Sequence, residues 1–424
     1  MTVYAQHPDT LKSDWYSVHA QTTVINQFKP AFSVKYSGDN SLGPQQESKT
    51  SITSTLFLGT RLWKGASLFI DPEIAGGSGL SKALGVAAAL NGETYRIGDP
   101  APQIYLARLF FRQVFSLTQN NTYQESDNNK IASWQPEKYL ALTVGKSSIT
   151  DYFDDNIYSH DPRTQFMSWA LMDNGAWDYP ANTRGYSPGI VIEYGSPRHE
   201  IRYGFSLVPL VANGNDMDWH FLEANSQTLE YTFRYKLKGK NGAVRLLGFY
   251  TIADMGNYRQ SLALDPQSPV ISDTRENGHS KYGLCLNAEQ EINDFMGCFF
   301  RTSWNDGNNE TWVFTEIDHS ISAGVASTGK LWKRAGDNLG LAYVASGISK
   351  PHRDYLQAGG DGFLLGDGNL TYSPEQLAEF YYSAELVKNH IFLSVAYQFL
   401  VNPGYNKDRQ GPVSIFSVRL HAQI

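Results

Sequence analysis

Hydrophobic and polar residues alternate along most of this chain. In LEYTFRYKL, from Leu229 to Leu237, every second side chain is apolar and nearly all of those between are polar. Because successive side chains of a β-strand point to opposite faces, this pattern predicts strands with one apolar and one polar face. Helical periodicity is nearly absent, and SPEQLAEF (373–380) is the one stretch that favours a helix.

Sixteen stretches with this alternation predict an all-β protein. Their predicted starts lie near Trp15, Ile52, Ala66, Ile104, Lys138, Pro188, His199, Gln227, Gly242, Ser280, Met296, Phe314, Asn338, Glu379, Ile391 and Pro412.

The connections between these strands alternate between short and long. Minimal turns such as GSPR and KGKN follow most even-numbered strands, and the longest connection runs from about 148 to 187. Two even-numbered connections, at 118–137 and 328–337, are exceptions. Transmembrane up-and-down barrels have short periplasmic turns and long outer loops, and large barrels enclose an aqueous channel. The pattern predicts a transmembrane antiparallel β-barrel of about sixteen strands.

The last stretch, GPVSIFSVRLHAQI, keeps its alternation up to Ile424. A barrel must close on its first strand, because an unpaired edge in lipid leaves backbone groups without hydrogen bonds. We therefore expect Phe416, Val418 and Leu420 to face lipid. Arg419 and His421 lie in the opposite phase and are expected to face the channel.

The predicted organisation is a periplasmic segment, residues 1–14, followed by one barrel domain, residues 15–424. MTVYAQHPDT lacks the apolar core of a signal peptide, so we expect the signal peptide to be absent from this sequence. A soluble all-β sandwich or propeller is the alternative fold. The chain has no blade-like repeat, and such folds do not need alternating connection lengths.

Charge and motifs give no indication of an enzyme or of a nucleic-acid partner. The net charge is -7, and GVASTGKL (324–331) misses the Ser or Thr of a phosphate-binding loop. The ten histidines have no metal-ligand spacing, and Asp-rich segments such as 360–369 are typical of turns. Cys285 and Cys298 lie in opposite phases, which favours free thiols. We expect no catalytic site, cofactor or metal.

The longest connection, 151–186, carries the residues that bind sugars in proteins, because aromatic faces stack on sugar rings and charged groups bind hydroxyls. Its place as the third outer connection predicts a loop folded into the pore, since a connection of this length is rarely inert. The candidate pore-lining residues in it are Asp154, Arg163, Trp177, Asp178 and Arg184.

Alternation also nominates residues on the wall that faces this loop. Arg61 and Glu73 lie on the polar faces of their strands, and Arg108 and Arg112 share one face opposite Leu109. A charge on the lipid face at mid-membrane costs about 2–4 kcal/mol, so these side chains are expected to point into the pore.

Five long segments resemble the carbohydrate-selective outer-membrane porins, the OprB-like family. They are TSTLFLGTRLWKGASLFIDPEIAGG, NGETYRIGDPAPQIYLARLFFRQVF, NGAWDYPANTRGY, GISKPHRDYLQAGGDGFLLGDG and VNPGYNKDRQGPVSIFSVRLHAQ. The resemblance implies a sixteen-stranded barrel in a Gram-negative outer membrane, through which sugars diffuse past an arginine-lined constriction. By motif, the positions carried over are Arg61, Glu73, Arg96, Arg108, Arg112 and Arg184.

The chain departs from this family at both ends. SDWYSVHAQTTV leads directly into alternation, where members of the family often have an Asp-Trp-Gly-Gly segment and a short helix. Ile424 stands where such barrels usually end in Phe. The first departure bears on any periplasmic plug, and the second bears on assembly.

The sequence thus predicts a passive outer-membrane channel for small carbohydrates, surrounded by lipid. A general or anion-favouring pore is the alternative within channels, because inward arginines also attract carboxylates and phosphates. A soluble sugar-binding protein and a barrel enzyme are the alternatives from other classes. The oligomeric state stays open between monomer and homotrimer.

Overall fold

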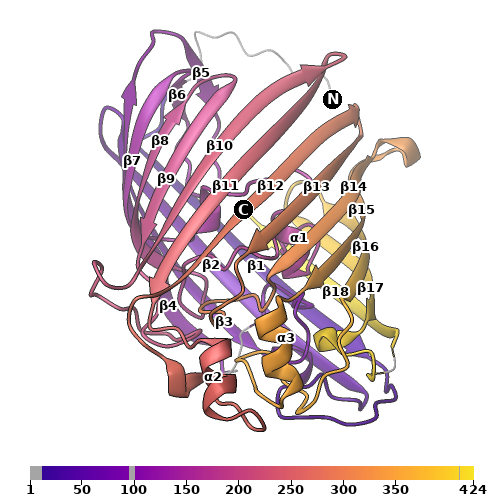
Figure 1. Ribbon diagram of the computed structural model, residues 1–424. Helices are drawn as coiled ribbons and strands as arrows, with labels where there is room; N and C mark the ends of the chain where they lie inside the picture. Colours follow the sequence, from indigo (N-terminus) through magenta and orange to yellow (C-terminus); the bar gives the residue numbers. More distant parts are fainter. Residues whose placement is uncertain (1–11, 95–100, 410) are drawn as a thin grey trace.

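The computed structural model describes residues 12–94, 101–409 and 411–424. Sixteen antiparallel strands form one closed barrel, and each strand pairs with its neighbours in chain order (Figure 1). They are β1 (Tyr16–Lys29), β2 (Glu47–Trp63), β3 (Ala66–Gly77), β4 (Gln103–Ser116), β7 (Tyr139–Ser147), β8 (Ser187–Gly195), β9 (His199–Ser206), β10 (Asn225–Leu237), β11 (Lys240–Ala253), β12 (His279–Asn293), β13 (Met296–Asn305), β14 (His319–Gly329), β15 (Arg334–Gly347), β16 (Glu375–Val387), β17 (Ile391–Val401) and β18 (Val413–Gln423).

The short elements lie in the connections. They are the hairpin β5 (Asn121–Gln124) and β6 (Ser133–Pro136), the helices α1 (Trp169–Met172), α2 (Tyr258–Leu264) and α3 (Lys350–Gln357), and the 3-10 turns η2 (Leu80–Ala83), η3 (Ile149–Asp151), η4 (Ile271–Thr274), η5 (Lys330–Trp332) and η6 (Pro403–Tyr405). Among the described residues, no helix is long and apolar enough to cross a membrane.

The barrel closes between β1 and β18, with a register that runs from Gln21 opposite Gln423 to Phe28 opposite Phe416. Ile424 extends this pairing, because its amide donates to Ala20 O at 2.9 Å. The prediction that the last residues complete the wall is confirmed.

Alternation along β18 separates an outer apolar face from an inner polar one. Phe416 and Val418 are each 49% exposed, whereas Arg419 is 1% exposed. The predicted inward direction of Arg419 is therefore correct, but its guanidinium binds the carbonyls of Pro162 and Gln165 in an inserted loop instead of facing an open channel. Because the apolar side is the outer surface and polar groups point inward, the surface suits surrounding lipid.

Two sequence predictions about elements are wrong. SPEQLAEF is not helical, because 375–380 belongs to β16, where Glu375 and Glu379 point inward and bind loop backbone. Phe314 does not start a strand. It lies in a buried connection that precedes β14, which begins at His319.

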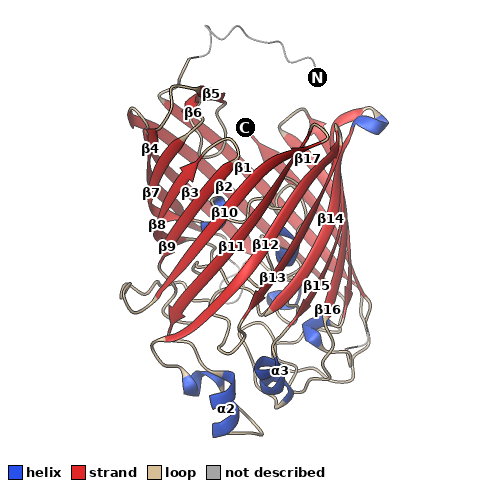
Figure 2. Ribbon diagram, turned by 45° about the horizontal axis from the view of Figure 1, so that its top comes forward, coloured by secondary structure: helices blue, strands red, loops and turns tan. Residues whose placement is uncertain are grey.

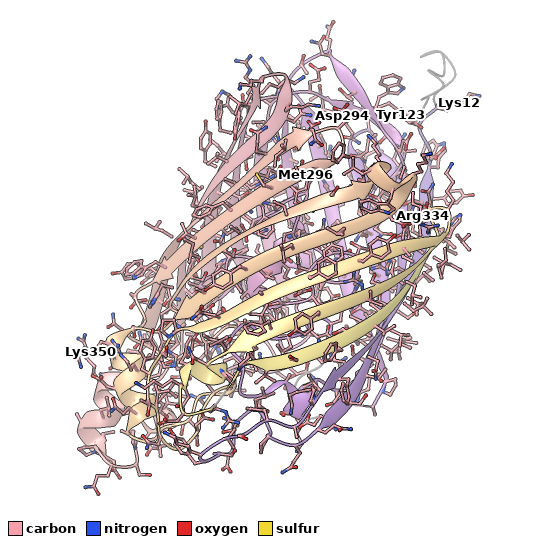
Figure 3. The ribbon with its side chains drawn as sticks, turned by 90° about the vertical axis from the view of Figure 1, so that its right-hand side faces the viewer. Lys12, Tyr123, Asp294, Met296, Arg334 and Lys350 are labelled. Atoms are coloured by element: carbon pink, nitrogen blue, oxygen red, sulfur yellow. The ribbon has the colours of Figure 1, made fainter. Side chains whose placement is uncertain are left out.

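The two ends of the barrel differ. The turns that join β10 to β11 and β12 to β13 are short and lie at one end, the short-turn end, together with the β5–β6 hairpin (Figure 2). The long connections, with α2 and α3, lie at the opposite end. Figure 3 shows Asp294 and Tyr123 at the short-turn end and Lys350 of α3 at the other. This arrangement confirms the predicted alternation of connections.

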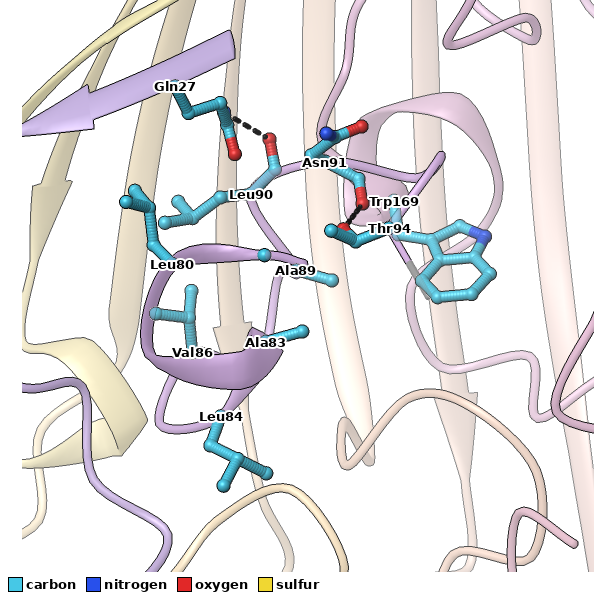
Figure 4. A pocket seen from close by; sticks show the side chains of 11 residues that line it. Gln27, Leu80, Ala83, Leu84, Val86, Ala89, Leu90, Asn91, Thr94 and Trp169 are labelled. Atoms are coloured by element: carbon cyan, nitrogen blue, oxygen red, sulfur yellow. Dashed lines mark hydrogen bonds between the residues drawn. The ribbon is translucent and has the colours of Figure 1, made fainter. Parts of the chain in front are cut away.

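Long connections fill one side of the lumen. In the third one, Phe166 packs between Phe299 of β13 and Tyr381 of β16, at ring-centroid distances of 5.8 and 5.0 Å. Residues 80–94 lie beside it, where Gln27 of β1 donates to Leu90 O at 3.2 Å (Figure 4). The hydrophobic core of this barrel is therefore inside it, between wall and loops.

Candidate pore constriction

A cavity of about 1480 Å³, lined by charged, polar and aromatic residues, occupies the other side of the lumen. Strands β2, β3, β4, β7, β8 and β9 contribute inward side chains to it, and the third long connection, 148–186, forms its opposite wall. Near the short-turn end it reaches Trp15 and Trp63, and near the loop end it reaches Arg184.

Arg163 joins the third connection to the wall at the centre of this cavity. Its Nε donates to Glu93 at 2.7 Å, and its Nη2 donates to Glu73 at 3.2 Å. Its Nη1 also reaches the hydroxyl of Thr55 on β2, at 3.3 Å. One guanidinium thus holds two loops against the wall.

Glu73 of β3 is 3% exposed and is fixed from several directions. The hydroxyls of Thr55 and Tyr105 each donate to its carboxylate at 2.5 Å, and that of Tyr186 donates at 3.0 Å. A buried carboxylate with this many donors is held in one orientation. Glu73 therefore sets the positions of Arg163 and of both phenol rings.

Arg108 of β4 forms a two-pronged ion pair with Asp151 of η3, with its Nε and Nη2 each 2.7 Å from a carboxylate oxygen. Its guanidinium also lies 5.1 Å from the centre of the Tyr186 ring. Ser148 caps the turn that presents Asp151, through reciprocal bonds between side chains and backbone. The planar guanidinium is thus held edge-on by an acid and stacked on a ring.

A second row of charges continues along the same wall. Arg112 donates to Thr143 at 3.0 Å and is ion-paired with Glu193. Arg202 of β9 reaches Glu193, Glu200 and Glu230 at 3.3, 2.5 and 3.4 Å. Acids and guanidinium groups therefore alternate around the open side of the lumen.

Arg184 and Arg61 lie toward opposite ends of the cavity. The guanidinium of Arg184 lies 4.1 Å from the centre of the Tyr105 ring, and its Nη2 donates to Gln103 at 2.8 Å. Arg61 lies near the short-turn end, where its amide donates to Trp15 O. The candidate Arg96 lies outside the described residues.

Two titratable loop groups at this site have shifted pKa values. Burial raises the pKa of Glu93, and the Arg163 guanidinium only partly opposes that rise. Burial alone lowers the pKa of His160, but the neighbouring carboxylates Asp173 and Asp155 outweigh it and raise that pKa to about 9. His160 is therefore a cation at neutral pH on the loop side of the cavity.

Comparisons with known proteins identify the family. Residues 39–424 match the carbohydrate-selective porin, OprB family. This chain belongs to that family.

Solved structures of outer-membrane proteins share the fold. The high-pH structure of Pseudomonas putida OprB has a TM-score of 0.71 at 14% sequence identity, over 97% of this chain and 94% of that one. The outer membrane channel DcaP of Acinetobacter baumannii has a TM-score of 0.52 at 11% identity, over 96% of this chain and 97% of that one. No curated protein sequence matches the chain.

The family membership and the barrel make this chain an outer-membrane porin for carbohydrates, as the sequence predicted. Six of the ten candidate residues in this OprB-family porin line the cavity. They are Arg61, Glu73, Arg108, Arg112, Arg163 and Arg184.

Three loop candidates lie away from the cavity and hold the loop in place. Asp154 is buried and accepts the amide of Asn174 at 2.6 Å. Asp178 accepts the amides of Trp312, Val313 and Phe314 at 2.7–3.0 Å. Trp177 is fully buried and packs on Phe153. Their assignment to the pore lining is therefore corrected. Aromatic and charged residues serve both to anchor a folded loop and to bind a sugar, so residue type alone does not separate the two roles.

Sequence reasoning missed several lining residues, among them Tyr105, Asp151, Tyr186, Glu193 and Arg202. Alternation places Glu193 in the phase opposite Ile192 and Tyr194, and Arg202 on the polar face of IRYGFSL (201–207), so the inward direction of both could be predicted. No local pattern marked Asp151 and Tyr186, because their positions depend on how the loop folds back.

Proposed function

We propose that this porin passes mono- and short oligosaccharides into the periplasm by passive diffusion, with Arg108, Arg163, Glu73 and Tyr186 as the selective constriction. The observation that carries the proposal is that each guanidinium here is paired with a carboxylate and lies beside a phenol ring or hydroxyl. Paired charges supply donors and acceptors for sugar hydroxyls in fixed positions, while ring faces suit the C–H surfaces of a sugar.

The cavity also has a suitable size. At about 1480 Å³ it exceeds the roughly 300–1,000 Å³ of pockets that enclose drug-sized ligands. A short oligosaccharide fits such a space and keeps some of its water. Weak contacts at several successive sites favour passage over retention.

An anion-favouring pore is the second candidate, and Arg61 favours it. Among the described residues, Arg61 forms no ion pair, yet it lines the cavity near the short-turn end. An unpaired guanidinium there raises the local concentration of anions. The test of the first proposal must therefore separate sugar flux from anion flux.

The test is conductance and liposome swelling with purified porin, comparing wild type with Arg108→Ala and with Arg198→Ala. Arg198 is an exposed turn residue and serves as the control. We expect Arg108→Ala to lower the rate of maltose-driven swelling relative to ion conductance, because Asp151 loses its partner and the stacked guanidinium is gone. Equal sugar rates in all three proteins, together with strong anion preference, would favour the second candidate.

A further inference from the structure

The connection between β4 and β7 is long although it lies at the short-turn end. Residues 118–137 form the β5–β6 hairpin, whose base is closed by a bond from the Leu117 amide to Lys138 O at 2.9 Å. The other connections at this end that join adjacent strands are short turns. A separate two-stranded unit thus lies where the other connections are short turns.

The tip of the hairpin bends into the lumen. Ile131 is 4% exposed and packs with Phe69 and Phe110, two inward-facing residues of β3 and β4 that also line the cavity. A tight turn from Asp127 to Lys130 precedes it, and Asn129 takes a left-handed conformation that Asn tolerates. The tip is therefore packed against the inner wall of the barrel.

Polar contacts hold the hairpin on two sides. On the β3 side, Asn129 Nδ2 donates to the fully buried Asp71, at 2.8 Å. On the β1 side, His19 Nε2 lies 2.8 Å from Ser126 Oγ, and the Asp14 amide donates to Ala132 O at 2.8 Å. The hairpin thus reaches from β4, where it begins, to β1, three strands away along the wall.

The hairpin also contacts the constriction through one residue. Asp71, which Asn129 binds, lies 3.6 Å from Arg108 Nη1. Residues Gln124, Asp127, Asn128 and Lys130 of the hairpin line the same cavity as Arg108. Solute that passes Arg108 toward the short-turn end therefore meets the hairpin next.

We infer that the β5–β6 hairpin is a second narrowing of the pore, which sets an upper size for solutes at the short-turn end. Its polar side chains are hydrogen-bond partners for the hydroxyls of a sugar leaving the constriction, and this part of the inference rests on the proposed function. Asn129 is a positioning residue, because it fixes the tip and the carboxylate of Asp71 and does not need to touch solute.

The direct test replaces residues 118–137 by an Asn-Gly turn, which suits a two-residue connection between paired strands. We expect single-channel conductance in salt to rise about twofold, because pore width limits ion flow. Oligosaccharides that wild-type porin excludes should enter liposomes. Heat-dependent mobility in gel electrophoresis checks that the barrel has folded. A folded variant with wild-type conductance would overturn the inference.

If the deletion does not fold, the double variant Asn129→Ala with Ile131→Ala decides, because it removes the contacts that hold the tip in the lumen, to Asp71 and to Phe69 and Phe110, and keeps the hairpin. Raised conductance supports the inference and unchanged conductance overturns it. Thr122→Ala, on an exposed hairpin position outside the cavity lining, is the matched control. Conductance in salt tests the narrowing without sugar, so a failure of the sugar proposal alone leaves this result unaffected.

Discussion

The two sides of the lumen use the same kinds of inward residue in different ways. On the packed side, β11 to β18, charged side chains bind the backbone of inserted loops. Glu379 accepts the amides of Met167 and Ser168, and Arg419 donates to the carbonyls of Pro162 and Gln165. On the open side, β2 to β9, charged side chains pair with one another around a cavity.

This difference separates what builds the pore from what selects solute. A loop inside a barrel must satisfy its amides and carbonyls, since buried backbone groups need partners. On the packed side, carboxylates accept hydrogen bonds from loop amides, and guanidinium groups donate to loop carbonyls. The charged side chains on the open side are not needed to bind loop backbone, and they line the cavity instead.

The largest effect is expected from removing an anchor on the packed side. Arg301 is 1% exposed and donates to the carbonyls of Leu171, Asp154 and Ser159 at 2.7–3.1 Å. Arg301→Ala should lower the free energy of unfolding by about 3–5 kcal/mol, since it leaves buried acceptors and Asp154 unpaired. Urea titration followed by tryptophan fluorescence measures this change.

The control is Lys350→Ala, because both side chains of the Lys350–Asp354 ion pair are exposed. It should change stability by less than about 1 kcal/mol. A loss at Arg301 no larger than that at Lys350 would mean that the packed side does not depend on its charged anchors.

The distinction between the sides also explains how far sequence reasoning reached. Alternation is a local property of a strand, so it predicted the barrel, its closure and the inward direction of Arg61, Glu73, Arg108 and Arg112. It did not separate the loop candidates, because Arg163 and Arg184 face the cavity whereas Trp177 is buried behind it. Which loop residue faces solvent depends on contacts with strands more than 100 residues away, such as Asn156 with Asn287.

A smaller effect, on selectivity rather than stability, is expected from the open side. Arg163→Ala leaves Glu73 and Glu93 without their guanidinium. The ratio of cation to anion permeability, taken from reversal potentials in a salt gradient, should rise at least about twofold, because one positive charge leaves the cavity. Arg163→Lys keeps the charge and should stay near wild type. A ratio unchanged in Arg163→Ala would place ion selection elsewhere.

The smallest effect concerns Glu316, which holds an outer loop on the packed side. Burial raises its pKa from 4.5 to about 8, although the amides of Leu364 and Leu365 oppose this. The closed loop binds this proton more tightly than the opened loop does. The closed state is therefore most favoured below pH 4.5 and weakens as the pH rises to about 8.

Hydrogen exchange at Leu364 and Leu365, corrected for the intrinsic rate, should then show less protection at pH 8 than at pH 5. Glu316→Gln keeps a neutral side chain at every pH and should remove this dependence, whereas the exposed Glu276→Gln should retain it. Persistence of the pH dependence in Glu316→Gln would assign it to another group. Its loss would show that Glu316 holds this loop best when its carboxyl group is uncharged.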